Sequence, residues 1–232
     1  MSRIGALFGA LALGSLVACA GPDLPSEAGD VASPVASAPG TGPALSSEAR
    51  RVSQIAAWSG DRDYLMLDKA RGEIIVFQGG RPTFSGAALT GEFPADYLAP
   101  DAIGKTFHET VGLKYKVTPA GRYTVSIGFD PAYGNTLDVN EIQGKDWDIA
   151  IHKVWLGAPA EHRDVRLRSS KGQDKHITYG CIDVDGSTMA GLLDRLPNEE
   201  ATPIYILPQD ESLIIKLFQP RSAAGKMSTP TG

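Results

Sequence analysis

The apolar residues of this 232-residue chain fall in short runs separated by glycine, proline and polar turns, and this spacing constrains the fold more than any other feature. Runs of this length suit β-strands better than helices. We interpret residues 64–67, 73–77, 122–127, 149–152, 177–184 and 203–207 as strands. The first two enclose a glycine-containing turn at 68–72 and predict a β-hairpin. The chain is therefore predicted to be mainly β, a β-sandwich with a few attached helices.

Two segments carry helical patterns instead. Residues 47–58 are predicted to form a helix with Ser46 or Ser47 as its cap and Glu48 in the first turn, and they place Val52, Ile55 and Ala56 on one face. Asp185 can cap a second helix, whose apolar stripe is Met189, Leu192, Leu193 and Leu196. Residues 92–116 show no clear periodicity, and we interpret them as a lid or an insertion.

The N-terminus predicts export. Arg3 precedes an apolar run that is too short for a typical membrane-spanning helix, so residues 1–18 are interpreted as a signal peptide. The run ends in Leu16-Val17-Ala18-Cys19, which resembles the bacterial lipobox. That resemblance implies cleavage before Cys19, lipidation of Cys19 and a membrane anchor on the periplasmic side. By the same analogy Ala20 favours the outer membrane. An ordinary signal peptide with a chance cysteine is the alternative.

Composition divides the rest of the chain. Residues 19–45 are mostly proline, alanine, serine and glycine, which predicts a flexible tether. Residues 46–219 are predicted to form one folded domain, and 220–232 a disordered tail. The net charge of -5, with no block of lysine and arginine to offset it, argues against a nucleic-acid partner. We expect a monomer.

The second cysteine is the main candidate for chemistry. If Cys19 is lipidated, Cys181 has no disulfide partner within the mature chain, although exported compartments are oxidising. Burial as a small apolar residue is one reason to keep such a thiol, and catalysis is the other. Gly180 allows backbone amides to turn toward a developing oxyanion. His152, at the end of an apolar run, can take the thiol proton, although an unselected histidine is more often part of a core.

Two blocks together resemble the signature of the L,D-transpeptidases. They are Ile151-His152-Lys153-Val154 and Ile177-Thr178-Tyr179-Gly180-Cys181-Ile182-Asp183-Val184. A third segment, Thr118-Pro119-Ala120-Gly121, looks like the Thr-Pro-x-Gly segment of that family. The resemblance runs over about residues 63–208, with the segments in the family's order.

The resemblance implies acyl transfer on peptidoglycan stem peptides. Cys181 would be the nucleophile, His152 the base, and the backbone carbonyl of Lys153 the group that orients the imidazole ring. Backbone amides around Tyr179, Gly180 and Cys181 would hold the oxyanion. The candidates for substrate binding are Thr178, Asp183, Thr118, Pro119 and Gly121. The terminal D-alanine would leave, and the acceptor would be a stem amine, a protein amine, a free D-amino acid or water.

Three features depart from the family pattern. Tyr179 stands where histidine is frequent, and Asp183 where arginine or asparagine is usual. A carboxylate beside the thiol disfavours the thiolate and repels a substrate carboxylate, so Asp183 is expected to lower the rate or change the substrate. The segment between His152 and Cys181 is also long, and residues 156–176 are interpreted as an insertion. Its basic residues (Arg163, Arg166, Arg168 and Lys171) form either a solvated surface or a rim that attracts an acidic polymer.

The sequence also bears on metal binding, on a second candidate for the base and on alternative functions. No spacing of His108, His162 and His176 with acidic residues or cysteine matches a metal site, so neither a metal nor a cofactor is expected. His176 is the second candidate for the base. A non-catalytic wall-binding lipoprotein and an L,D-carboxypeptidase that uses water are the alternative functions. A papain-like protease is disfavoured, because its Cys-Gly-Ser-Cys-Trp type of segment is missing and the histidine precedes the cysteine.

Overall fold

The computed structural model describes residues 42–102, 112–142, 149–196 and 201–218. The strands are β1 (Tyr64–Asp68), β2 (Glu73–Gln78), β3 (Arg81–Gly91), β4 (Gly121–Asp130), β5 (Gly134–Asn140), β6 (Ala150–Lys153), β7 (His176–Thr178), β8 (Ile182–Val184) and β9 (Thr202–Ile206). The α-helices are α1 (Ser47–Trp58), α2 (Arg163–Arg168), α3 (Gly186–Arg195) and α4 (Ile214–Phe218). Single turns of 3-10 helix lie at Pro100–Ala102, Leu113–Tyr115, Pro159–Glu161, Gly172–Lys175 and Glu211–Leu213.

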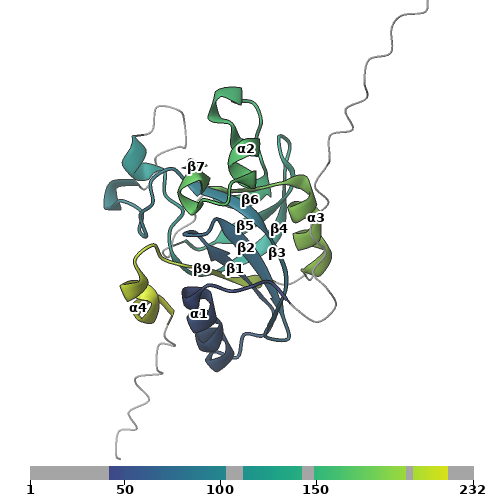
Figure 1. The fold of residues 1–232 in the computed structure, drawn as a ribbon, viewed down its shortest axis with the longest axis vertical. Helices are drawn as coiled ribbons and strands as arrows, with labels where there is room; N and C mark the ends of the chain where they lie inside the picture. The colour runs from purple at the N-terminus through teal and green to yellow at the C-terminus, as the bar shows by residue number, and fades with distance from the viewer. Residues whose placement is uncertain (1–41, 103–111, 143–148, 197–200, 219–232) are drawn as a thin grey trace, which may run out of the picture. The chain divides into compact units, whose positions relative to one another are not determined.

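The strands form one sheet that closes on itself (Figure 1). The hydrogen-bonded order is β2-β1-β9-β4-β5-β6-β8-β3-β7, and β2 also pairs with β3. That last pairing closes a ring from which only β7 is excluded. The mainly β prediction is confirmed, but the sandwich is replaced by a barrel-like sheet, because β3 is long enough to pair with β2 along one part and with β8 along another.

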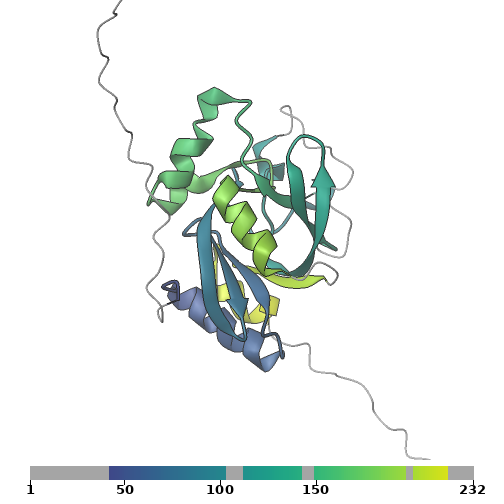
Figure 2. The same ribbon diagram turned by 90° about the vertical axis from the view of Figure 1, so that its right-hand side faces the viewer.

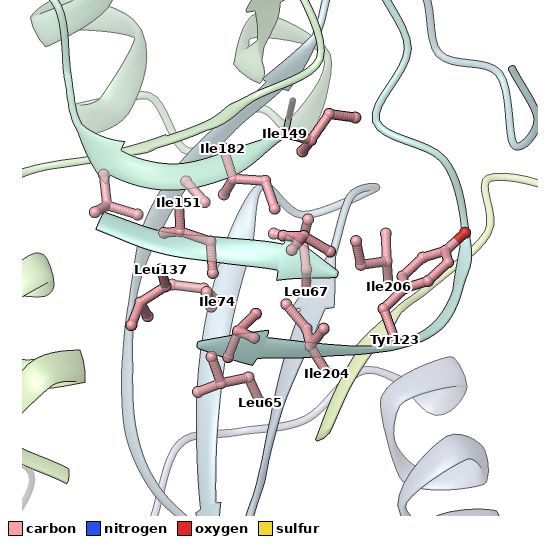
Figure 3. Packing of buried hydrophobic residues seen from close by; sticks show 14 of the residues in the cluster. Leu65, Leu67, Ile74, Tyr123, Leu137, Ile149, Ile151, Ile182, Ile204 and Ile206 are labelled. Atoms are coloured by element: carbon pink, nitrogen blue, oxygen red, sulfur yellow. The ribbon is translucent and has the colours of Figure 1, made fainter. Parts of the chain in front are cut away.

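The alternation of side chains along β1 creates two cores. Leu65 and Leu67 point into the ring with residues from the other strands, and Figure 3 shows these side chains facing one another. Tyr64 and Met66 point the other way and pack under α1 and α4. A strand buried on both faces explains the continuous apolar run that the sequence shows at 64–67. The helix α3 lies along the outside of the strands, packed against β3 and β6 (Figure 2).

The local predictions are largely confirmed. The helix α1 begins after Ser46, whose hydroxyl accepts a hydrogen bond from the Ala49 amide. Asp185 caps α3 in the same way through the Thr188 amide. The hairpin of β1 and β2 has the predicted turn. The strands β3 and β5 and the short helices α2 and α4 were not predicted from the sequence. Residues 177–184 were predicted as one strand, where the structure has β7 and β8 separated by a bend.

The bend lies where two parallel strands meet. β6 and β8 pair in parallel, with Ile151 opposite Ile182 and His152 opposite Asp183. The two isoleucines are fully buried in the core. Because neighbouring side chains alternate, His152 and Asp183 face away from that core, and Cys181 shares the face of Asp183. The parallel pairing therefore brings together residues from the two sequence blocks.

A buried lysine ties the segment after β3 to the barrel. The Lys69 ammonium donates to the Ala95 carbonyl, the Asp96 carboxylate and the Thr118 carbonyl, each at 2.9 Å. Asp96 also accepts hydrogen bonds from the backbone amides of Gln209 and Asp210. Lys69 is 2% exposed, so the ion pair is shielded from water. This network, and not helix or strand periodicity, orders residues 92–102 and 112–120.

Several predictions fall outside the described residues. These are the signal peptide, the lipidated Cys19, nearly all of the tether, the tail and the middle of the 92–116 segment. In the part of the chain that is described, no helix is long and apolar enough to span a bilayer.

The buried ion pair yields a stability prediction. Lys69→Met keeps the apolar stem but leaves the Asp96 carboxylate buried without its cation. We expect the free energy of unfolding to fall by about 3–5 kcal/mol, measured by urea denaturation. Lys114→Met, which removes one partner of an exposed pair with Asp101, is the control and should leave the free energy of unfolding almost unchanged, because water already solvates both charges. A change of similar size in both variants would contradict the role given to Lys69.

Candidate active site

Cys181 lies on a bend that two threonine hydroxyls hold in place. Gly180 has φ of +133°, a conformation that favours glycine. The Thr178 hydroxyl accepts from the Gly180 amide at 3.1 Å and donates to the Cys181 carbonyl at 2.6 Å. The Thr118 hydroxyl donates to the Gly180 carbonyl at 2.8 Å. The bend is thereby fixed on both sides while Cys181 stays partly exposed.

The imidazole of His152 is held in one orientation. Its Nδ1 lies 2.9 Å from the Lys153 carbonyl oxygen. A carbonyl can only accept, so Nδ1 carries the hydrogen and Nε2 is the basic nitrogen. The Tyr133 ring stacks on the imidazole with centroids 3.9 Å apart and planes at 21°. The backbone therefore sets the tautomer of this buried histidine, and an aromatic neighbour sets the plane of its ring.

A row of three charged side chains extends outward from His152. The Asp183 Oδ1 lies 3.6 Å from His152 Nε2, and Asp183 Oδ2 accepts from Arg163 at 2.7 Å. Arg163 in turn donates to Glu161 at 2.6 Å. Asp183 is fully buried, and among the described residues its Oδ1 has no hydrogen-bond partner. The carboxylate that replaces the family's usual arginine or asparagine is therefore paired with a guanidinium supplied by α2.

Burial perturbs two groups beside the thiol. Desolvation raises the pKa of Asp183 above its ordinary value, against the opposing attraction of His152 and Arg163. Desolvation also raises the pKa of Tyr133, and the nearby Cys181 and Asp183 add to that rise. Perturbed groups of this kind gather at functional sites more often than elsewhere.

One cavity of about 300 Å³ joins these residues. Its lining consists of Tyr133, His152, Trp155, Ala158, Glu161, Arg163, Thr178, Tyr179, Cys181 and Asp183. The Cys181 thiol and the His152 imidazole therefore line the same cavity. Tyr133 and Asp183, which contact His152, line it as well. Its charged side chains other than His152 are two carboxylates and one guanidinium, so it does not present the basic surface that a rim of arginines would give.

Not all of the predicted site residues reach this cavity. Thr118, Pro119 and Gly121 are buried, and none of them lines it. A Cβ on Gly121 would lie 2.5 Å from the Tyr123 hydroxyl, so glycine is needed there for packing. Gly180 is also buried, and its amide already donates to Thr178. Of the residues proposed to bind substrate, Thr178 and Asp183 are the two at the cavity.

The alternative base lies elsewhere. His176 Nδ1 is 2.9 Å from the Thr90 hydroxyl, and its Nε2 is 3.2 Å from the Gln209 amide nitrogen. Burial lowers the pKa of His176. Because both ring nitrogens have partners and the ring does not line the cavity, His152 is the better candidate for the base.

Sequence reasoning missed three contributors to the site. Tyr133, in the turn between β4 and β5, carries no local motif. Trp155 was not singled out, and its ring packs 5.7 Å from the Arg163 guanidinium carbon. Arg163 was grouped with the solvent-facing basic residues, but it is 6% exposed. Only Arg168 and Lys171 of that group are exposed, and Arg166 donates to two backbone carbonyls.

Comparison with known proteins gives a fold likeness of low similarity. No family model matches the chain, and no curated protein matches it. The NMR structure of the catalytic domain of the E. faecium L,D-transpeptidase is similar at 15% identity and a TM-score of 0.40, over 62% of this chain and 96% of that one. A crystal structure of an L,D-transpeptidase from Mycobacterium tuberculosis H37Rv is similar at 13% identity and a TM-score of 0.38, over 62% and 57%.

The Ldtfm–avibactam carbamoyl enzyme gives a similar result, with 15% identity, a TM-score of 0.38 and coverage of 63% and 49%. The chain thus spans less than two thirds of two of these three proteins. Similarity at this level does not establish membership of a family.

The position of Asp183 generates a prediction about pH. Asp183→Asn removes a negative charge from the cavity that Cys181 also lines, and a nearby negative charge disfavours the thiolate. The pH–rate profile for Cys181 alkylation should therefore shift toward lower pH. Asp164→Asn removes a carboxylate of the same charge from the exposed side of α2 and should leave the profile unchanged. Superimposable profiles for wild type and Asp183→Asn would show that Asp183 does not act on the thiol.

Proposed function

We propose that the protein is a peptidoglycan L,D-transpeptidase that works through a cysteine acyl-enzyme on stem tetrapeptides. The observation that carries this proposal is the shared cavity of Cys181 and His152, with the His152 tautomer fixed by the Lys153 carbonyl. A thiol on a bend and a basic Nε2 facing the same space form the minimal equipment for acyl transfer. The order of the sequence motifs adds the substrate class.

In the first half-reaction, His152 Nε2 takes the Cys181 proton and the thiolate attacks the carbonyl of the third stem residue. A carbon–sulfur bond forms, and the carbonyl oxygen carries the negative charge until the bond to the terminal D-alanine breaks. The imidazolium returns the proton to the leaving amine. Backbone amides of the bend hold the oxyanion. One such donor contributes about 10²–10³ in rate.

In the second half-reaction, an acceptor amine attacks the thioester and passes a proton to His152. The new amide forms as the carbon–sulfur bond breaks, and the thiolate is restored. The acceptor is a stem side-chain amine, a protein amine or a free D-amino acid, and with water the same steps give an L,D-carboxypeptidase. A cavity with two carboxylates against one guanidinium suits a cationic acceptor better than an anionic one.

Asp183 was expected to lower the rate or change the substrate, and a complete loss of activity through this residue would leave a non-catalytic wall-binding protein. Its pairing with Arg163 weakens that alternative, because the carboxylate beside the base is compensated by a buried guanidinium. The same carboxylate faces Nε2 at 3.6 Å and stabilises the imidazolium that the mechanism forms. In the proposed mechanism, the Asp183 carboxylate therefore assists His152 as the base.

Covalent capture tests the activity. Wild-type protein incubated with a carbapenem should gain the mass of one β-lactam at Cys181, measured by intact and peptide mass spectrometry. Cys181→Ala and His152→Ala should each lose this acylation, and the double variant should be no worse because the two groups act as a unit. His176→Ala, which removes a histidine outside the cavity, is the control and should acylate normally. Acylation of His152→Ala at the wild-type rate would exclude it as the base.

We also propose that the protein is anchored to the membrane through lipid on Cys19, most simply in the outer membrane. The support is the lipobox-like Leu16-Val17-Ala18-Cys19 and the proline- and serine-rich stretch that follows it. Cys19→Ser should move the protein from the membrane fraction to the soluble fraction, measured by fractionation and immunoblotting. Ser15→Ala, a change in the same segment, should leave it with the membranes. A membrane-bound Cys19→Ser protein of normally processed size would refute the anchor.

A further inference from the structure

We propose that Thr118 is a positioning residue that aims the Cys181 backbone amide at the oxyanion. This inference rests on the proposed acyl transfer. It concerns a side chain that is buried and does not touch the cavity. Thr118 would act only through the peptide unit that joins Gly180 to Cys181.

The Thr118 hydroxyl has a single direction in which to donate. Its oxygen accepts a hydrogen bond from the Gly91 amide at 2.8 Å, and the Gly180 carbonyl lies 2.8 Å away as acceptor. The Gly91 backbone can approach this closely because it has no side chain. A Cβ there would lie 2.5 Å from the Lys116 carbonyl and 2.7 Å from the Thr118 amide. The hydroxyl proton is therefore committed to Gly180.

The Thr118 backbone is itself anchored. Its carbonyl accepts from the buried Lys69 ammonium at 2.9 Å. Thr118 is 1% exposed, so no water competes with these bonds. The threonine is thus a fixed point that connects Lys69 and β3 with the bend.

Fixing the Gly180 carbonyl fixes the Cys181 amide. The two belong to one planar trans peptide, so the C=O and the N–H point in opposite directions. With the carbonyl drawn toward Thr118, the Cys181 N–H is turned away from it. The Gly180 amide donates to Thr178 and is less available to a substrate. The Cys181 amide belongs to the peptide unit that Thr118 holds, and it is the amide that we assign to the oxyanion.

Comparing the rates of two reactions of the Cys181 thiol, acylation and alkylation, distinguishes a positioning role of Thr118 from a merely structural one. Acylation by a carbapenem passes through an oxyanion, whereas alkylation by iodoacetamide is a displacement at carbon that develops none. Thr118→Val removes the hydroxyl and keeps the shape. The ratio of the acylation rate to the alkylation rate should fall about 10- to 100-fold, a part of what a whole oxyanion donor contributes. Thr118→Ser restores the hydroxyl and should bring the ratio back to within about threefold of wild type.

Thr90→Val is the matched control. It removes another fully buried hydroxyl, one that contacts His176 on the neighbouring strand and not Gly180. It should lower the melting temperature without changing the ratio. Both rates are measured at Cys181 by peptide mass on the full chain, at a temperature where circular dichroism shows each variant folded.

Each outcome decides the proposal. A wild-type ratio in Thr118→Val, or an equal fall in Thr90→Val, overturns it. If Thr118→Val does not fold, Thr118→Ala takes its place, and loss of folding in both would show that the residue serves stability alone and overturn the proposal. Absence of acylation in the wild-type chain would overturn the proposed function, and this inference with it. Normal acylation of both wild type and Thr118→Val overturns this inference only.

Discussion

The buried Lys69–Asp96 pair is the interaction on which the rest of the structure depends. The Lys69 ammonium donates hydrogen bonds to three acceptors in the segment after β3. The Asp96 carboxylate accepts a hydrogen bond from the Gln209 amide, which lies just after β9. Burial lowers the pKa of Lys69, against the opposing attraction of Asp96. An amine in this setting is stabilised by its bonds and not by water. From Thr118 the same network continues to the bend that carries Cys181, so a charge in the barrel supports geometry at the surface.

A second charge arrangement serves the base. The side chains of Asp183, Arg163 and Glu161 form a line that ends at His152, and Arg163 and Glu161 come from the segment 156–176. The resemblance to L,D-transpeptidases suggested a positive or neutral residue two positions after the cysteine. Here the positive charge comes from α2 and the carboxylate occupies the strand. The segment 156–176 therefore contributes to the cavity, which its polar composition alone did not indicate.

Local signals carried the sequence predictions that succeeded. The cap at Ser46, the hairpin turn and the apolar stripe after Asp185 each depend on residues within a few positions of one another. Closure of the sheet and burial of Arg163 depend on partners far along the chain, and periodicity contains no information about them. Tyr133 stacks on His152 from a distant part of the sequence, and no local motif around Tyr133 indicates this contact. The pairing of His152 with Cys181 was predicted only because their two blocks are recognisable together.

The closed ring also limits how this protein can meet a partner. A strand in an open sheet offers unpaired backbone groups that another extended chain can join. In the described residues that opportunity is limited to the three-residue β7, which has a neighbour on one side, and to the outer ends of β4 and β5, which pair only with each other. Over the rest of the ring each strand has neighbours on both sides, which disfavours strand exchange and edge-to-edge association there. A partner chain that added a strand to this sheet would have to do so at β7 or at the tip of the β4–β5 hairpin.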